Sequence, residues 1–209
     1  MRGYFFVMEG LDGSGGTTQS RMLADWLHHQ GGFADVVLTH EPSAGPVGQF
    51  LRTALKIGGN AEQIGDAVLP YLFAADRRDH LDRTVIPALR RNAAVVSDRY
   101  YHSSLAYQSL TIGLARVAQL NDAFRKPDLT IYLDLSPEAS LERILARGGE
   151  LERFETLDRL RSVKDAYDSV LVHCRTRGEQ IARIDARPSI ESVHQAVIAA
   201  VQNHIQAHP

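Results

Sequence analysis

The stretch Tyr4-Phe-Phe-Val-Met-Glu-Gly-Leu-Asp-Gly-Ser-Gly-Gly-Thr-Thr-Gln19 determines how the rest of the chain can be arranged. Residues Tyr4 to Met8 form a short apolar run rich in aromatic and β-branched side chains, which predicts a buried strand. Glycines dominate the following residues, and from Thr17 onward the apolar residues recur with helical spacing. A strand, a glycine-rich loop and a helix in this order are typical of a phosphate-binding loop, because inward-turned backbone N–H groups and a helix N-terminus both favour an anion.

The usual phosphate-loop pattern is G-x-x-x-x-G-K-[ST]. Gly10 and Gly15 match it, Thr17 matches the hydroxyl on the magnesium side, and Gly16 stands where lysine is expected. The backbone cradle survives this change, but one donor to the transferring phosphoryl group is lost. Loss of one such preorganised donor typically costs about a hundred- to a thousand-fold in rate. Taken alone, the loop is equally compatible with a glycine-rich turn that binds nothing.

The composition indicates a soluble globular protein. A chain of 209 residues fits one α/β domain, here residues 1–209, with at most a small lid. The formal net charge of -2 gives no indication of nucleic-acid binding. One cysteine, Cys174, excludes an intrachain disulfide, fits a reducing cytosol and is expected to be a core or semi-exposed thiol and not a nucleophile. Without a signal-peptide pattern or an apolar stretch near the roughly 20 residues of a membrane span, we expect a cytoplasmic protein without a membrane partner.

Short apolar runs alternate with helical patterns along the chain. The further strands are expected at Asp35–His40, Ala93–Ser97, Leu129–Leu135 and Gln180–Asp185. The expected helices are Thr17–Gln30, Val47–Leu55, Asn60–Leu89 with a break near Pro70, a helix start at Ser103–Gln108, Pro137–Arg147 with Ser136 as N-cap, Leu157–Arg177 and Ile190–Ile205. This alternation predicts an α/β fold with a doubly wound, five-stranded parallel sheet flanked by helices.

Polar residues follow two of these strands. The loop at Glu41-Pro42 comes after the second strand, and Asp98 and Arg99 end the third. Ligands of open parallel sheets bind at the carboxyl edge, so both segments should face the same cleft as the glycine loop. A carboxylate there is well placed to hold magnesium, and an adjacent arginine can bind a phosphate. The alternative interpretation is that Asp98 and Arg99 form only a surface ion pair at the end of the strand.

Two charged segments have both a structural and a functional interpretation. The run from Asp76 to His80 would ordinarily be a solvated helix face, but Arg77 lies on the same helix face as Phe73. The segment 143–156 places arginines around Gly148-Gly149, where the chain can hinge. It is either a surface charge cluster or a mobile lid that brings arginines over phosphates and excludes water.

The order of these motifs resembles bacterial thymidylate kinase, the P-loop enzyme that transfers a phosphoryl group from ATP to dTMP. The resemblance covers nearly the whole chain and rests on Met8 to Gln19, Glu41-Pro42, Leu72-Phe-Ala-Ala-Asp-Arg77, Asp98-Arg-Tyr100, Ser103-Ser-Leu-Ala-Tyr-Gln108, Lys126-Pro-Asp-Leu-Thr-Ile-Tyr-Leu-Asp134 and the arginine lid. It implies a P-loop NTPase fold with a small lid at about 143–156, Mg2+ with ATP as co-substrate, and a homodimer.

The resemblance also implies residue roles. On the dTMP side Phe73 would stack on thymine, Arg77 would hydrogen-bond its carbonyl, and Tyr107 would pack by the deoxyribose. The full dTMP-binding set is Asp12, Glu41, Pro42, Arg52, Phe73, Arg77, Arg99, Ser104, Tyr107 and Gln108. The ATP-binding set is Gly10, Gly13, Ser14, Gly15, Gly16, Thr17, Thr18, Arg143 and Arg187, with Thr17 and Asp98 serving the metal. The catalytic set is Asp12, Arg99, Arg147 and Arg153, as in the subfamily that carries its catalytic arginine in the lid.

The departures from the family pattern leave alternatives open. Gly16 replaces lysine, His40 stands where the family usually has arginine, and Ser43-Ala-Gly45 replaces the usual Gly-Gly-Thr. The protein is therefore an active kinase in which a lid arginine supplies the missing charge, a slow kinase, a kinase for another nucleotide, or a nucleotide-binding pseudokinase with little or no transfer activity. The sequence favours activity, because the lid arginines and Asp98-Arg99 otherwise have no evident role.

Overall fold

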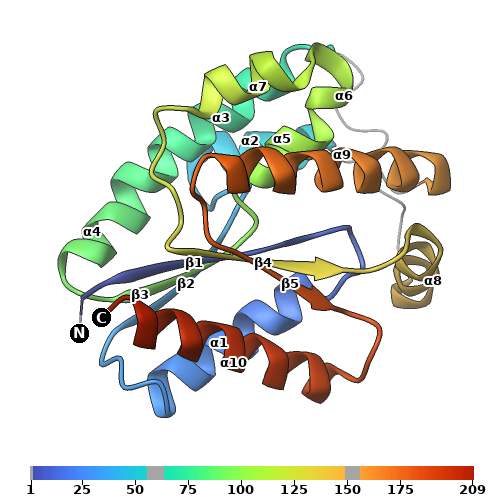
Figure 1. Ribbon diagram of the computed structural model, residues 1–209. Helices are drawn as coiled ribbons and strands as arrows, with labels where there is room; N and C mark the ends of the chain where they lie inside the picture. Colours follow the sequence, from blue (N-terminus) through green and yellow to red (C-terminus); the bar gives the residue numbers. More distant parts are fainter. Residues whose placement is uncertain (1, 56–63, 149–155) are drawn as a thin grey trace.

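A single parallel sheet organises the computed structural model, which describes residues 2–55, 64–148 and 156–209 (Figure 1). Its strands are β1 (Tyr4–Gly10), β2 (Val36–His40), β3 (Ala94–Asp98), β4 (Leu129–Asp134) and β5 (Ile181–Asp185). They lie in the order β2-β3-β1-β4-β5, and every neighbouring pair is parallel. The predicted five-stranded parallel sheet is therefore confirmed, with the strand before the glycine loop at its centre.

Helices cover both faces of the sheet (Figure 1). On one face lie α1 (Gly16–His29) and α10 (Ile190–Ala207); on the other lie α3 (Leu69–His80), α5 (Tyr101–Tyr107) and α9 (Leu157–Thr176). Because side chains of a strand alternate between faces, β1 contributes to two cores. Tyr4, Phe6 and Met8 pack in the core beneath α1 and α10, whereas Phe5 and Val7 pack in the opposite core. A central strand buried on both faces explains why this segment is continuously apolar.

The helices agree with the predicted ranges except in two places. The chain is not helical at residues 64–68, and α3 begins at Leu69, so Pro70 lies in the first turn of a helix and does not break one. Proline fits there because the first N–H groups of a helix have no intrahelical acceptor. Two short helices that the sequence analysis missed, α6 (Ser109–Ile112) and α7 (Leu114–Asn121), follow α5.

The remaining helical elements are α2 (Pro46–Leu55), a π-helical turn (Leu81–Val85), α4 (Ile86–Arg90) and α8 (Pro137–Arg147). The predicted N-cap of α8 is confirmed, since Ser136 Oγ accepts a hydrogen bond of 3.3 Å from the N–H of Ala139. All strands run in the same direction, so their carboxyl ends meet at one edge of the sheet, to the right in Figure 1 beside α8. That edge carries the glycine loop, and it is where a ligand of this architecture is expected.

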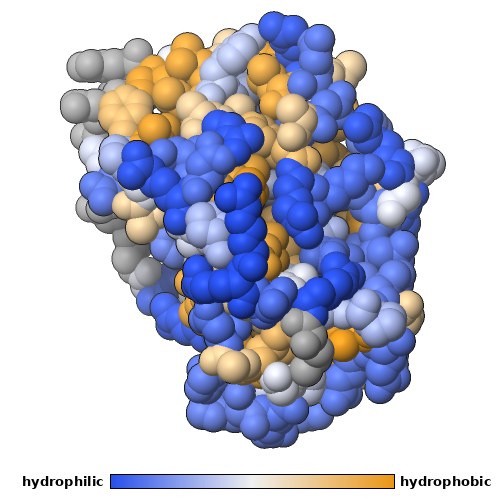
Figure 2. Space-filling model, turned by 90° about the vertical axis from the view of Figure 1, so that its left-hand side faces the viewer, coloured by the Kyte–Doolittle hydropathy of each residue, from blue (hydrophilic) through white to orange (hydrophobic). Residues whose placement is uncertain are grey.

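The side of the molecule that bears both chain termini is mostly hydrophilic, with hydrophobic side chains gathered mainly in the upper part of the view (Figure 2). Within the described ranges, none of the helices combines the length and the apolar character needed to cross a membrane.

Candidate active site

The glycine loop between β1 and α1 is built from backbone that other residues do not fit. Gly13 has φ +80° and Gly15 has φ +98°, conformations that L side chains rarely adopt. A Cβ on Gly13 would lie 2.7 Å from the carbonyl oxygen of Ser140 in α8. The close approach of α8 therefore excludes a side chain at Gly13 unless α8 moves.

Helix α8 forms one wall of the cavity above the glycine loop. Ser140 Oγ donates a hydrogen bond to the carbonyl of Asp12, and this bond fastens the helix to the loop. The last turns of α8 then bring Arg143 and Arg147 into the lining. We call this cavity the glycine-loop pocket; it is lined by Met8, Glu9, Gly10, Leu11, Asp12, Gly13, Ser14, Gly15, Gly16, Thr17, Thr18, Asp98, Arg99, Arg143, Ile144 and Arg147.

The predicted metal-binding residues lie together in this pocket. Thr17 Oγ1 donates a hydrogen bond of 2.5 Å to Asp98 Oδ2, which joins the start of α1 to the end of β3. A Cβ on Gly16 would lie 3.0 Å from the other carboxylate oxygen of Asp98. A hydroxyl and a carboxylate on the wall of a phosphate loop form the hard oxygen donor set that Mg2+ prefers, so these residues fit that ion.

A second cavity adjoins the first, between α3, α5 and the loop after β2. We call it the acceptor pocket; it is lined by Asp12, Glu41, Pro42, Leu55, Phe73, Arg77, Arg99, Tyr100, Ser103, Ser104, Tyr107 and Gln108. It contains all the residues predicted for the dTMP side except Arg52. The segments that contribute them are far apart in the sequence, so the fold itself assembles this set.

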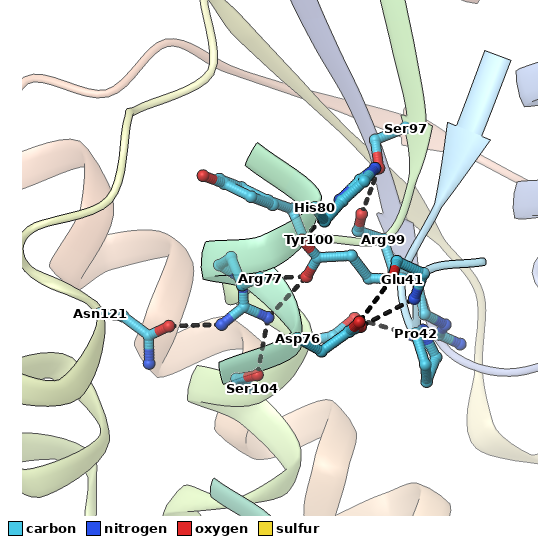
Figure 3. Close-up of polar contacts among 12 residues, drawn as sticks. Glu41, Pro42, Asp76, Arg77, His80, Ser97, Arg99, Tyr100, Ser104 and Asn121 are labelled. Carbon is cyan, nitrogen blue, oxygen red and sulfur yellow. Dashed lines mark hydrogen bonds and ion pairs between the residues drawn. The ribbon is translucent and has the colours of Figure 1, made fainter. Parts of the chain in front are cut away.

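Arg77 lies at the centre of a buried network beside the acceptor pocket (Figure 3). Its Nε donates to Glu41 Oε2 at 2.9 Å and its Nη2 lies 2.7 Å from the same oxygen. Nη2 also donates to Ser104 Oγ at 3.0 Å, and Nη1 donates to Asn121 Oδ1. Because a buried charge is costly unless it is paired and hydrogen-bonded, these contacts fix the orientation of the guanidinium.

Two further buried residues of α3, Asp76 and His80, hold the Glu41-Pro42 loop. His80 Nδ1 lies 3.1 Å from Glu41 Oε1, and Asp76 accepts hydrogen bonds from the N–H and Oγ of Ser43 at 2.7 and 2.5 Å (Figure 3). The interpretation of the run 76–80 as a solvated face is therefore wrong for three of its five residues, because Asp76, Arg77 and His80 are buried. The other face does carry exposed i,i+4 ion pairs, Arg78–Asp82 and Asp79–Arg83.

Asp12 and Arg99 line both pockets and connect them. Arg99 Nη2 lies 2.5 Å from Asp12 Oδ1, and Tyr107 donates a hydrogen bond of 2.9 Å to Asp12 Oδ2. Burial is the largest single influence on Arg99 and favours the neutral form, but the carboxylate of Asp12 and the other acidic groups around the guanidinium together outweigh it, and the pKa of Arg99 lies well above its usual value. Burial and the same carboxylate raise the pKa of Tyr107, so its hydroxyl stays protonated and donates.

Of the predicted site residues, Arg52 and Arg187 line neither pocket. Arg52 donates to the carbonyl of Ser43 and lies 3.1 Å from His40 Nδ1, so it contacts the back of the Glu41-Pro42 loop. Arg187 is exposed and pairs with Asp185 at 2.7 Å. Arg153 lies outside the described residues.

The structure adds site residues that the sequence analysis did not select. Tyr100 and Ser103 line the acceptor pocket, Glu9 lines the glycine-loop pocket, and Asn121 is a partner of Arg77. The first three stand within or beside motifs that the sequence does show, and position alone could have included them. Asn121 has no such signal, because it reaches Arg77 from a helix 44 residues away in the sequence.

Cys174 is buried, as predicted, and groups with His102 and Glu179, their candidate ligand atoms lying within 4.8 Å of one another. Burial and the carboxylate of Glu179 raise the pKa of the Cys174 thiol, which argues against a nucleophile. His102 Nε2 and Glu179 Oε2 are already hydrogen-bonded at 2.9 Å, so a metal ion is not needed to satisfy this pair.

Comparison with known proteins places this geometry in a family context. The sequence model of the thymidylate kinase family matches residues 8–197. A probable thymidylate kinase of Pyrococcus abyssi is 36% identical over 98% of this chain and 98% of its own length. A thymidylate kinase of Ruegeria pomeroyi is 43% identical over 73% of both chains, and one of Xanthomonas campestris pv. campestris is 36% identical over 98% of this chain and 87% of its own.

Proposed function

The chain belongs to the thymidylate kinase family and is a dTMP kinase, and we propose that it transfers the γ-phosphoryl group of ATP to dTMP where its two pockets meet. The observation that carries this proposal is that Asp12 and Arg99 line both the glycine-loop pocket and the acceptor pocket. A guanidinium at the junction can neutralise the acceptor phosphate on one side while the transferring group approaches from the other. Phosphoryl transfer depends chiefly on such positioning and electrostatic stabilisation.

The acceptor pocket would bind dTMP through one aromatic surface and a few fixed polar groups. Phe73 would stack on thymine, Gln108 would contribute polar contacts to the base, and Tyr107 would pack against the deoxyribose. Arg77 would donate to a thymine carbonyl from an orientation already set by Glu41 and Ser104. Because these polar groups need not reorganise when the nucleotide enters, little of the binding free energy is spent on ordering them.

The glycine-loop pocket would bind the ATP phosphates through main-chain N–H groups and the N-terminus of α1. Thr17 and Asp98 would hold Mg2+, which supplies charge neutralisation to the phosphates when bound. Arg143 and Arg147 line the wall opposite the loop and would supply the positive charge that Gly16 lacks. Arg153, from the lid segment at about 143–156, would join them.

In the transfer itself, a phosphate oxygen of dTMP attacks the γ-phosphorus of ATP, and the bond from that phosphorus to the β,γ-bridging oxygen breaks. The products are dTDP and ADP, and no covalent intermediate with the protein is required. Arg99 would hold the attacking phosphate, and Asp12, next to the sugar, would keep Arg99 oriented. The α8 arginines would neutralise the charge that accumulates on the leaving ADP.

The alternative of a nucleotide-binding pseudokinase depends on Gly16 alone. The family match and the arginine-lined wall of the glycine-loop pocket favour transfer instead.

We also propose that residues 1–209 form one kinase domain, which is supported by a family match spanning 8–197 and by the single sheet. A homodimer remains our expectation; exposed apolar side chains of Phe50, Val68 and Tyr71 on and beside α2 and α3 are consistent with it.

The test is to incubate the purified chain with ATP, Mg2+ and dTMP and to follow dTDP formation, with UMP, dUMP, dCMP and dGMP as matched acceptors. We expect turnover with a clear preference for dTMP. Binding of both nucleotides without product above the uncatalysed background would establish the pseudokinase alternative. A stronger preference for another acceptor would show that the altered loop after β2 has changed the specificity.

A further inference from the structure

Glu9 is a buried carboxylate at the carboxyl end of β1, on the strand face that points toward α5 and α9. Its side chain is 0% exposed. It accepts hydrogen bonds from the N–H groups of Tyr100 and Ser103 at 2.8 and 3.2 Å, from Ser103 Oγ at 2.7 Å and from the hydroxyl of Tyr167 at 2.8 Å. Burying a carboxylate is costly, so four donors converging on it indicate a constrained arrangement.

The same two hydroxyls contact the guanidinium at the junction of the pockets. Arg99 Nη1 donates to Ser103 Oγ at 2.9 Å and lies 3.4 Å from the hydroxyl oxygen of Tyr167. Each hydroxyl has one proton, and a carboxylate is a stronger acceptor than a hydroxyl, so both protons point to Glu9 and not across the 3.0 Å contact between the two hydroxyls. The lone pairs of Ser103 and Tyr167 are then left for Arg99, which can only donate.

Glu9 also holds the backbone next to Arg99. Arg99 has φ +73°, a left-handed conformation that is uncommon for a residue other than glycine. Its own N–H donates to the carbonyl of Met8 at 2.9 Å, and the N–H of the next residue, Tyr100, donates to Glu9 Oε1. The carboxylate therefore stabilises the turn that aims the arginine side chain at the pocket junction.

We propose that Glu9 is a positioning residue for Arg99, and that it sets the affinity for the phosphate of the acceptor nucleotide without touching that nucleotide. It acts by fixing both the backbone turn and the hydroxyl protons around the guanidinium. This inference rests on the proposed function in one respect, the assignment of the dTMP phosphate to Arg99. It goes beyond that assignment by naming what holds Arg99 in place.

The test is the binding of dTMP and of thymidine to the full chain, measured by calorimetry for the unaltered protein, Glu9→Gln, Arg99→Ala and the double variant. Glu9→Gln keeps the shape but replaces an acceptor oxygen with a donor, which reverses the hydroxyl orientation. We expect dTMP affinity to fall roughly tenfold or more in Glu9→Gln, with thymidine affinity within about twofold of the starting value, because thymidine has no phosphate.

The double variant distinguishes positioning from a general structural role. If Glu9 acts through Arg99, Glu9→Gln should cost no further dTMP affinity once Arg99 is alanine, and the two losses should be strongly non-additive. Additive losses, or an equal loss of thymidine affinity, would overturn the inference. An Arg99→Ala variant that binds dTMP normally would instead overturn the assignment of the phosphate to Arg99, and the inference with it.

Two further variants keep the test decisive. Asp128→Asn removes a carboxylate that is 12% exposed, accepts a hydrogen bond of 2.8 Å from the N–H of Phe5 at the other end of β1 and lines neither nucleotide pocket, so it should leave both affinities unchanged even if the protein is less stable. Ser103→Ala removes one of the hydroxyls between Glu9 and Arg99, and it should lower dTMP affinity selectively even if Glu9→Gln does not fold. Unchanged dTMP affinity in a folded Ser103→Ala protein would contradict the proton arrangement described above.

Discussion

The two pockets solve the problem of binding a charged nucleotide in different ways. In the acceptor pocket, the key cation is fixed beforehand: Arg77 is 1% exposed and is held by Glu41, Ser104 and Asn121. In the glycine-loop pocket, the loop itself provides no cationic side chain; Arg143 and Arg147 come from the end of α8, and Arg99 follows β3. Fixed donors suit the selection of a base, and we expect the arginines at the end of α8, which border the predicted lid, to neutralise the phosphoryl group as it is transferred.

The largest effect should come from disrupting the ion pair with Glu41 that fixes Arg77 in the acceptor pocket. Glu41→Gln leaves the guanidinium of Arg77 buried without its carboxylate, and removing one partner of a buried ion pair typically costs about 3–5 kcal/mol. We expect the free energy of unfolding, measured with urea, to fall by roughly that amount. The matched control is Asp82→Asn in the exposed Arg78–Asp82 pair, which should change it by less than about 1 kcal/mol. Equal effects of both variants would show that the acceptor pocket is not preorganised by its ion pair.

The next largest effect should come from removing an arginine of the glycine-loop pocket. Arg147→Ala removes a cation from the wall of the glycine-loop pocket, and we expect turnover to fall about a hundred- to a thousand-fold while dTMP affinity is preserved. Arg161→Ala, an exposed arginine paired with Glu138 on the surface, is the matched control and should turn over normally. Arg153→Ala should be measured in parallel, since normal turnover in both Arg147→Ala and Arg153→Ala would end the idea that these arginines replace the missing lysine.

The parts of the site that the sequence could predict are those encoded by local pattern. The glycine loop follows a buried strand, and the residues Phe73, Arg77 and Gln108 lie in motifs whose order is preserved along the chain. The fold confirmed that they line one pocket, and it placed the strands and most helices where apolar periodicity predicted them. Each motif, strand and helix depends on residues close together in the sequence, whereas the fold brings the separate motifs into one pocket.

The parts that could not be predicted depend on distant partners. Glu9 follows the predicted strand Tyr4 to Met8 without a role that the sequence assigns to it, and its role is visible only when Tyr167, 158 residues away, is seen to donate to it. Asp76 and His80 read as surface charges until Ser43 and Glu41 are found against them. Charge patterns in a sequence show which residues can pair, but burial decides which pairs matter, and burial is a property of the fold.

A smaller effect should come from giving the glycine loop the lysine it lacks. Gly16→Lys in the Arg147→Ala background should recover part of the lost turnover, about tenfold, because an ammonium returns beside the phosphates. The recovery should be incomplete, since the added Cβ lies 3.0 Å from Asp98 Oδ1 and the carboxylate must shift by a few tenths of an ångström. Gly16→Ala adds the same Cβ without the charge and should give no recovery. If alanine and lysine recover turnover equally, charge is not what the loop is missing.

The smallest effect should come from Arg187, the predicted adenine-side residue. Its guanidinium pairs with Asp185 at 2.7 Å, outside the lining of both pockets, and it lowers the pKa of that carboxyl to about 2. A depressed folded-state pKa means that the pair contributes above the ordinary carboxyl pKa and is lost only as the pH falls toward 2, so it persists through the working range. Arg187→Ala should therefore raise the KM for ATP by no more than about threefold, with the same ratio from pH 6 to 9, because the arginine is already engaged elsewhere. A larger rise in the KM for ATP would mean that Arg187 leaves Asp185 to bind the nucleotide. Arg187 would then be a further cation of the glycine-loop pocket.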